Sequence, residues 1–233
     1  PRIFSATWWS GGCFPMPSGP LKKTPRRRGH VAEARQGRDR NVSPEQTRHF
    51  QQAARPAAFL DRDGTINVEV NYLRRVEDLA LEPGAAAAVR RLNEAGLLVI
   101  VASNQSALAR GMLSEEGLAE IERRMEALLA AEGARVDEWY YCPHLPDAAV
   151  EAFRKACDCR KPAPGMLLRA AEELGVDLGA SVMIGDSERD VEAGRAVGAA
   201  TVRVCHGRPP AQTAADFVAD DLAGAVEWWL GRR

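Results

Sequence analysis

The stretch Ala57-Ala58-Phe59-Leu60-Asp61-Arg62-Asp63-Gly64-Thr65 joins an apolar run to two acidic residues, a glycine and a threonine. The apolar run predicts a short, fully buried strand of a parallel sheet that is covered on both faces. Asp61 then lies at the carboxyl end of that strand, where open α/β sheets hold ligands. In an extended chain Asp61 and Asp63 point to the same side. Two carboxylates that meet in a crevice repel each other, so they stay ionised together only with a cation between them, or else one of them takes up a proton. Both outcomes suit catalysis. An ordinary turn is the alternative.

Beyond this stretch, apolar runs alternate with helical patterns along the chain, which predicts a doubly wound parallel α/β sheet. Further strands are expected at 97–102, 136–141, 181–185 and 201–204. The expected helices are an alanine-rich one ending at residue 95, one opening at Ser114, and others at 164–174, 190–198 and 222–230.

The length of 233 residues suits one domain of ordinary size, at 56–233, with a basic extension at 1–55. The extension is expected to be disordered, with a targeting segment or a basic arm for an acidic partner as alternatives. Its charge leaves the remainder acidic, which argues against nucleic-acid binding. No run of eighteen apolar residues occurs, so no membrane partner is expected.

Polar residues follow three of the predicted strands at the point where each strand ends. Asp61 and Asp63 follow the first strand, Ser103 and Asn104 the second, and Asp186 the fourth. Because the carboxyl ends of parallel strands share one edge of the sheet, we expect these side chains to form a single site.

Phosphoryl transfer is the chemistry that suits these residues, since it needs a nucleophile, a proton donor and positive charge. Asp61 can attack to form an aspartyl-phosphate, and Asp63 can protonate the leaving alkoxide and then deprotonate water. Asp61, Asp186 and the backbone carbonyl of Asp63 supply oxygen ligands for Mg²⁺. Ser103, the backbone N–H of Asn104 and the ammonium of Lys161 can stabilise the transferring oxygens.

The string Asp61-Arg62-Asp63-Gly64-Thr65 resembles the first motif of the haloacid dehalogenase superfamily, the aspartate-based phosphotransferases. The longer string from Phe59 to Asn67 resembles the heptose 1,7-bisphosphate phosphatases and their histidinol-phosphatase relatives, and the likeness extends from about Ala57 to about Val204. The resemblance implies catalytic roles for Asp61, Asp63, Ser103 and Lys161. It implies a metal ligand at Asp186 and a supporting role for Asp190, while Ser187 stands where relatives can carry lysine.

A second metal site is indicated by Cys142, His144, Cys157 and Cys159, which lie within eighteen residues. Three thiolates and an imidazole make a closed tetrahedral zinc set, so the expected role of the metal is structural. Such a cluster of thiols favours a reducing compartment, and we expect a cytoplasmic protein that is a monomer. Arg160 and Lys161 follow the last ligand directly, so the loop would hold two cations near the phosphate.

No large insertion follows the first or second motif, so the resemblance implies a fold without a large cap. Asn104, Gln105, Arg110 and Arg160 are the expected substrate-binding residues, and two arginines suit a bisphosphate better than an amine. The resemblance therefore implies a sugar-phosphate substrate, the 7-phosphate of heptose 1,7-bisphosphate, in heptose supply for lipopolysaccharide or other glycoconjugates. Histidinol phosphate is the alternative substrate, and a non-catalytic zinc-stabilised module is the alternative from another class.

Overall fold

The computed structural model describes residues 54–233. The expectations for the basic extension concern residues 1–55 and lie outside this range, apart from its last two residues. Arg55 already has backbone partners, since its N–H donates to Gly175 O and its carbonyl accepts from Asp177 N, each at 2.9 Å. The domain boundary at residue 55 stays a prediction.

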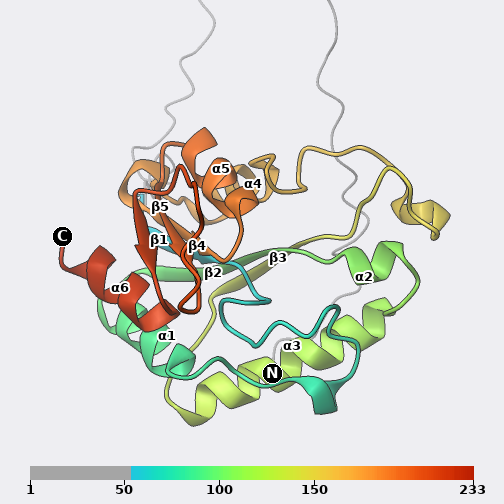
Figure 1. The fold of residues 1–233 in the computed structure, drawn as a ribbon, viewed down its shortest axis with the longest axis horizontal. Coiled ribbons are helices and arrows are strands. Elements are labelled where there is room, and N and C mark those ends of the chain that lie inside the picture. Colours follow the sequence, from blue (N-terminus) through green and yellow to red (C-terminus); the bar gives the residue numbers. More distant parts are fainter. Residues whose placement is uncertain (1–53) are drawn as a thin grey trace, which may run out of the picture. The chain divides into compact units, whose positions relative to one another are not determined.

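The described residues form a six-stranded, fully parallel sheet in the order β3-β2-β1-β4-β5-β6, with helices on both faces (Figure 1). The doubly wound α/β fold predicted from the sequence is thereby confirmed. The strands are β1 Ala57–Leu60, β2 Leu98–Asn104, β3 Glu138–Cys142, β4 Val182–Gly185, β5 Ala200–Val204 and β6 Phe217–Ala219. The α-helices are α1 Ala85–Glu94, α2 Ser106–Ala109, α3 Glu115–Ala131, α4 Gly165–Leu174, α5 Glu188–Ala196 and α6 Leu222–Leu230. Short 3₁₀ turns lie at Val76–Asp78, Glu151–Phe153 and Leu178–Ala180.

Two elements, β6 and α2, are absent from the expectations drawn from the sequence. They are three and four residues long, too short to show a hydrophobic period. The strand β6 pairs with β5 at the edge of the sheet, and only its last residue is buried. Neighbouring structure rather than local pattern therefore determines both elements.

The core lies on both faces of the sheet, because each strand sends alternate side chains to opposite sides. Ala58 and Leu60 of β1 join a cluster with residues of α1, α3 and α6, whereas Ala57 and Phe59 join a second cluster with α4. All four residues are fully buried. This two-sided burial explains why β1 is a continuous apolar run.

The strand β1 lies between β2 and β4, with Leu60 opposite Val101 on one side and Ile184 on the other. The chain therefore leaves β1 in one direction and returns to its other side after β3, which creates a topological switch point at its carboxyl end. Asp61 lies at this point, and its N–H donates to Ile184 O at 2.9 Å.

None of the helices within residues 54–233 combines the length and the apolar character that a bilayer crossing requires.

Candidate active site

The chain turns immediately after Asp61 instead of continuing as an extended strand. The N–H groups of Ile66 and Asn67 both donate to the Arg62 carbonyl, at 2.9 and 3.1 Å, and Gly64 has φ = +70°. A β-carbon at Gly64 would collide with the Asp186 carboxylate, so glycine permits both the left-handed turn and the close approach. The assumption of an extended chain through Asp63 is corrected here, because the turn begins at Arg62, before Asp63 is reached.

Asp61, Asp186 and Asp190 each place a carboxylate oxygen within 4.8 Å of the others. The ammonium of Lys161 lies 3.0 Å from Asp61 Oδ1 and 2.5 Å from Asp190 Oδ1. The Lys161 and Asp190 side chains are only 2% and 1% exposed, so this ion pair is excluded from solvent. The structure thus brings together residues that follow β1 and β4 with a lysine from the loop before α4.

Burial raises the pKa of Asp61 to about 6, although the charge of Lys161 opposes the shift. Burial, followed by the charge of Asp61, raises the pKa of Asp186 to about 7. For Lys161, burial lowers the pKa, but the charges of Asp190 and Asp61 outweigh burial, so the net pKa is raised. The site therefore holds more negative charge than one lysine offsets, and this donor set suits a divalent cation such as Mg²⁺.

The carboxylate of Asp63 has a different set of partners from that of Asp61. Arg62 donates to both of its oxygens at 2.9 Å, Asn67 Nδ2 donates at 3.1 Å and Gln105 Nε2 donates at 2.9 Å. Burial alone would raise the pKa of Asp63, but the adjacent charge and hydrogen bonds of Arg62 outweigh it and lower the pKa. Asp63 is accordingly held in its ionised form.

Gln105 joins the two sides of the site. Its side-chain nitrogen also donates to Ser103 Oγ at 3.1 Å, so one amide contacts both Ser103 and Asp63. Both Ser103 and Gln105 are almost fully buried, at 1% and 3% exposure. Gln105 therefore orients catalytic candidates, and a direct contact between Gln105 and a substrate stays a prediction.

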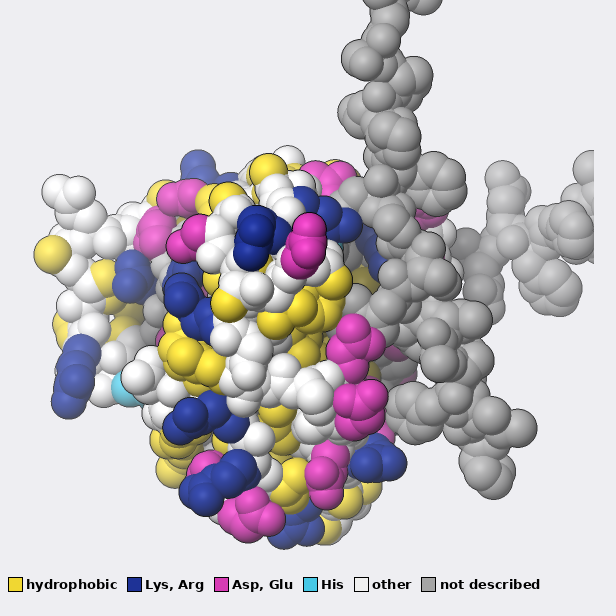
Figure 2. Space-filling model, turned by 90° about the vertical axis from the view of Figure 1, so that its right-hand side faces the viewer, with side chains coloured by type: hydrophobic (Ala, Val, Ile, Leu, Met, Phe, Trp, Pro, Cys, Tyr) yellow, Lys and Arg dark blue, Asp and Glu magenta, His cyan; other side chains and the backbone are white. Residues whose placement is uncertain are grey.

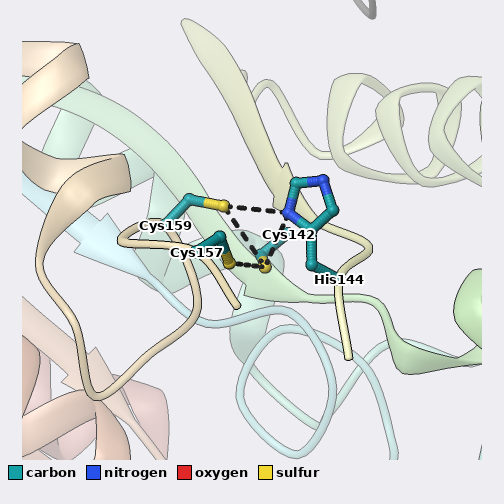
Figure 3. A group of neighbouring side chains, drawn as sticks. All are labelled: Cys142, His144, Cys157 and Cys159. Atoms are coloured by element: carbon teal, nitrogen blue, oxygen red, sulfur yellow. Dashed lines mark hydrogen bonds between the residues drawn. The ribbon is translucent and has the colours of Figure 1, made fainter. Parts of the chain in front are cut away.

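The four sequence-predicted zinc ligands do lie together. Cys142 ends β3, His144 follows it, and Cys157 and Cys159 come from the loop before α4; Figure 3 shows their side chains pointing toward one another. Cys142 Sγ is 3.6 Å from Cys157 Sγ and 3.4 Å from Cys159 Sγ, and His144 Nδ1 is 3.3 Å from Cys159 Sγ. Burial, aided by the charge of Lys155, lowers the pKa of His144, which keeps its imidazole in the neutral form that metals bind. This cysteine–histidine cluster could bind zinc.

The two arginines predicted to bind substrate have different environments. Arg160 Nη2 donates to Ser106 Oγ at 3.1 Å and Nη1 to His144 O at 3.4 Å, so its guanidinium links α2 to a residue of the candidate zinc cluster. Arg110 is exposed, and its guanidinium carbon lies 5.8 Å from the centroid of the Tyr72 ring. On the face drawn in Figure 2, basic side chains lie among acidic and apolar ones where residues are described.

Three residues with roles at the site were not assigned from the sequence. Arg62 pairs with Asp63, and its position between two aspartates was the available signal. Ser187 is the N-cap residue of α5 and forms a capping box in which Asp190 Oδ2 accepts from Ser187 N–H at 3.0 Å, which explains a serine at this position. The His206 ring contacts Gly64 O through Nε2 at 2.8 Å, and no local pattern around His206 indicated this contact.

Carboxylates after β1 and β4, together with a buried lysine ion-paired to one of them, define the class: a hydrolase with the haloacid dehalogenase fold. In agreement, the HAD-hydrolase-like family model matches residues 158–225. The chain is 42% identical over 172 residues to D-glycero-beta-D-manno-heptose-1,7-bisphosphate 7-phosphatase of Yersinia pestis, which covers 72% of this chain and 92% of that relative. It is 43% identical over 172 residues to the protein of the same name from Escherichia coli K12, covering 72% and 90% of the two chains. The chain therefore belongs to the D-glycero-beta-D-manno-heptose-1,7-bisphosphate 7-phosphatase family.

A solved structure agrees with this placement. The D,D-heptose 1,7-bisphosphate phosphatase from B. bronchiseptica, complexed with magnesium and phosphate, has a TM-score of 0.66 and 34% identity, covering 76% of this chain and 99% of that one.

Proposed function

We propose that this protein is a Mg²⁺-dependent phosphatase that removes the 7-phosphate of D-glycero-β-D-manno-heptose 1,7-bisphosphate, in the supply of heptose for lipopolysaccharide or other glycoconjugates. The observation that carries the proposal is the buried contact of Lys161 with Asp61 at the switch point of the sheet. This contact places the Lys161 ammonium beside the Asp61 carboxylate. Within residues 54–233, Asp61 is the only member of the acidic cluster that directly follows β1. The β anomer is taken from the names of the curated relatives.

In the proposed reaction, an Asp61 carboxylate oxygen attacks phosphorus while the bond from phosphorus to the sugar oxygen breaks. Asp63 gives a proton to that leaving oxygen. Water then attacks the aspartyl-phosphate, Asp63 takes the water proton, and phosphate leaves with Asp61 regenerated. Ser103 and Lys161 donate to the transferring oxygens throughout.

The contacts of Asp63 bear on its two roles. Arg62 holds Asp63 ionised, which is the form that deprotonates water in the second step. To protonate the sugar oxygen in the first step, Asp63 must gain a proton, and an arriving phosphate dianion favours this because like charge raises the pKa of a carboxyl group.

Mg²⁺ would be held by the carboxylates of Asp61 and Asp186 and by the backbone carbonyl of Asp63. When bound, it would offset the negative charge that the nucleophile and the phosphate bring together. The raised pKa of Asp186, caused by burial and then by the charge of Asp61, supports a cation at this position.

Zinc would be held by Cys142, His144, Cys157 and Cys159, which fill a tetrahedral set and leave no open position for water. Its role is structural, since it would hold the loop that ends in Arg160 and Lys161. The thiols of this set also support a reducing, cytoplasmic location.

Arg160 is the better supported contact for the second phosphate, because it directly precedes Lys161 and has its guanidinium at the start of α2. Arg110 is a second candidate, at the exposed end of α2. Either guanidinium would meet a phosphate favourably and an ammonium unfavourably. This favours the bisphosphate over histidinol phosphate.

The test is a comparison of kcat/KM for the β bisphosphate, its α anomer and histidinol phosphate. We expect the β bisphosphate to be preferred, and Arg160→Ala to lower its kcat/KM by about ten- to a hundred-fold, the effect of losing a charge-assisted contact. Arg154→Ala is the matched control, because Arg154 lies in the same loop but donates to Ala148 O at 2.8 Å. A preference for histidinol phosphate would overturn the assignment.

A further inference from the structure

The side chain of Asn104 makes two reciprocal hydrogen bonds with the backbone of Lys161. Asn104 Nδ2 donates to Lys161 O at 3.0 Å, and Lys161 N–H donates to Asn104 Oδ1 at 3.1 Å. One carboxamide thus serves both backbone polar groups of the residue whose ammonium reaches Asp61. These bonds join positions 57 residues apart in the sequence.

Asn104 is itself rigidly placed. It is the last residue of β2 and lies opposite Cys142 of β3 in the sheet register. The next backbone N–H, from Gln105, donates to Cys142 O at 2.8 Å. The carboxamide therefore projects from the end of a central strand, and it holds a loop that has no regular secondary structure at Lys161.

We propose that Asn104 is a positioning residue whose side chain sets the place of the Lys161 ammonium against Asp61, in addition to any contact its backbone makes with phosphate. The proposal rests on the proposed phosphatase function. A long, flexible lysine side chain can deliver its charge to one point only if its own backbone is held. Zinc would fix the loop at Cys159, two residues earlier, and Asn104 fixes it at Lys161 itself.

The Asn104→Ala variant removes both hydrogen bonds. Since a displacement of about 1 Å can cost on the order of a hundred-fold in rate, we expect kcat to fall by about ten- to a hundred-fold with a smaller change in KM. Asn104→Asp keeps the acceptor for the Lys161 N–H but sets a carboxylate against the Lys161 carbonyl, so its kcat should also fall.

The chain contains a matched control in Asn93, near the end of α1. Its side-chain nitrogen donates to Arg135 O at 3.1 Å, and its oxygen accepts from Arg135 N at 2.9 Å, the same reciprocal pairing in a place remote from the acidic cluster. Asn93→Ala therefore reports the loss of stability from such a pair without displacing Lys161. The melting temperature and zinc content of every variant are measured beside kcat and KM, with the metals loaded.

The deciding measurement is a double-mutant cycle with Lys161→Ala. If Asn104 acts through Lys161, Asn104→Ala lowers kcat in the unmodified protein but adds less than about two-fold in the Lys161→Ala background. A full additional loss in that background, or a change confined to KM, would show that the Asn104 side chain contacts substrate and would overturn the proposal. A lowered melting temperature with unchanged kcat, as expected for Asn93→Ala, would also overturn it.

The cycle can be run with any phosphate monoester that the unmodified enzyme hydrolyses. Failure to hydrolyse the heptose bisphosphate would therefore count against the proposed substrate alone. Absence of all phosphatase activity in the unmodified, metal-loaded enzyme would overturn both proposals.

Discussion

Asp61 lies where burial and neighbouring charge oppose each other, and the chemistry of the site depends on that balance. Burial raises the pKa of its carboxyl, whereas the charge of Lys161 favours the ionised form, which the proposed reaction needs for attack on phosphorus. An amide at this position would retain the shape but could neither attack phosphorus nor balance the lysine.

Asp61→Asn is therefore expected to lower kcat by about a thousand-fold or more, as removal of a catalytic nucleophile does. Circular dichroism should show the fold unchanged. Substantial phosphatase activity in a well-folded Asp61→Asn protein would contradict the aspartyl-phosphate mechanism.

Arg62 is fully buried, and its charge is compensated by Asp63 within the same turn. Removal of one member of a buried ion pair leaves the other uncompensated, and Arg62→Met should lower the free energy of unfolding by about 3–5 kcal/mol. The pKa of Asp63 is lowered by Arg62, so this stabilisation is present above the ordinary aspartate pKa and is lost as pH falls. Urea unfolding at neutral and acidic pH measures both effects.

Arg75→Met is the matched control for Arg62→Met. Arg75 also donates two hydrogen bonds to an aspartate, Asp78, each at 2.8 Å, but this pair is exposed. Its removal should change stability little, because solvent screens surface ion pairs. Equal losses in the two variants would show that burial of Arg62 is energetically unimportant.

At the scale of elements, the loop from β3 to α4 carries three of the four candidate zinc ligands and places Lys161 beside Asp61 at the end of β1. We expect about one zinc per chain in purified protein, as a four-ligand structural site binds. Cys157→Ser should lose the zinc and most of the activity while the requirement for Mg²⁺ persists. Cys205→Ser is the control, because Cys205 lies at the end of β5 outside the cluster and should keep both. Zinc analysis that finds no metal in active protein would exclude the site.

Glu122 of α3 is a largely buried acid whose side chain is hydrogen-bonded to Tyr141 of β3. Burial raises the pKa of Glu122 to about 7, and the charges of Glu126 and Glu138 add to the shift, against a hydrogen bond from Tyr141. A carboxyl group whose pKa is raised by folding contributes full stability below its unfolded pKa, and loses that contribution as pH rises through about 7.

Glu122→Gln should consequently be more stable than the unmodified protein at pH 8, by up to about 3 kcal/mol, with the difference shrinking toward pH 5. Melting temperatures of the two proteins across this range test the expectation. If the two melting temperatures depended on pH in the same way, folding would not raise the pKa of Glu122.

At the scale of the whole molecule, the sheet, the core clusters on its two faces and both candidate metal sites lie within residues 54–233. Deletion of residues 1–53 is expected to leave the melting temperature and kcat nearly unchanged, because the sequence there shows no hydrophobic period. The deletion must spare Arg55, whose backbone bonds to Gly175 and Asp177. A fall of more than about 5 °C, which corresponds to roughly 1–2 kcal/mol for a domain of this size, would show that the extension stabilises the domain.

The sequence by itself determined the parallel sheet and the edge at which the site forms. Buried strands in a two-sided sheet read as continuous apolar runs, and the polar residues at their carboxyl ends share one edge, so Asp61, Ser103 and Asp186 could be placed before their partners were known. The second strand was expected to end before Ser103, but β2 continues through Ser103 to Asn104. The zinc ligands were equally accessible, because three thiols and an imidazole within eighteen residues form the donor set that a structural zinc site requires.

Only the tertiary structure decided how these residues are held. The turn at Gly64 directs Asp63 toward Arg62 and Gln105, and the closeness of Gly64 to Asp186 depends on two strands being neighbours in the sheet. The carboxamide of Asn104 meets Lys161 across 57 residues of sequence. Such contacts carry no local period or spacing, because they arise from the packing of elements distant in the chain. For that reason the sequence could indicate candidate reacting groups but not the contacts that hold them in place.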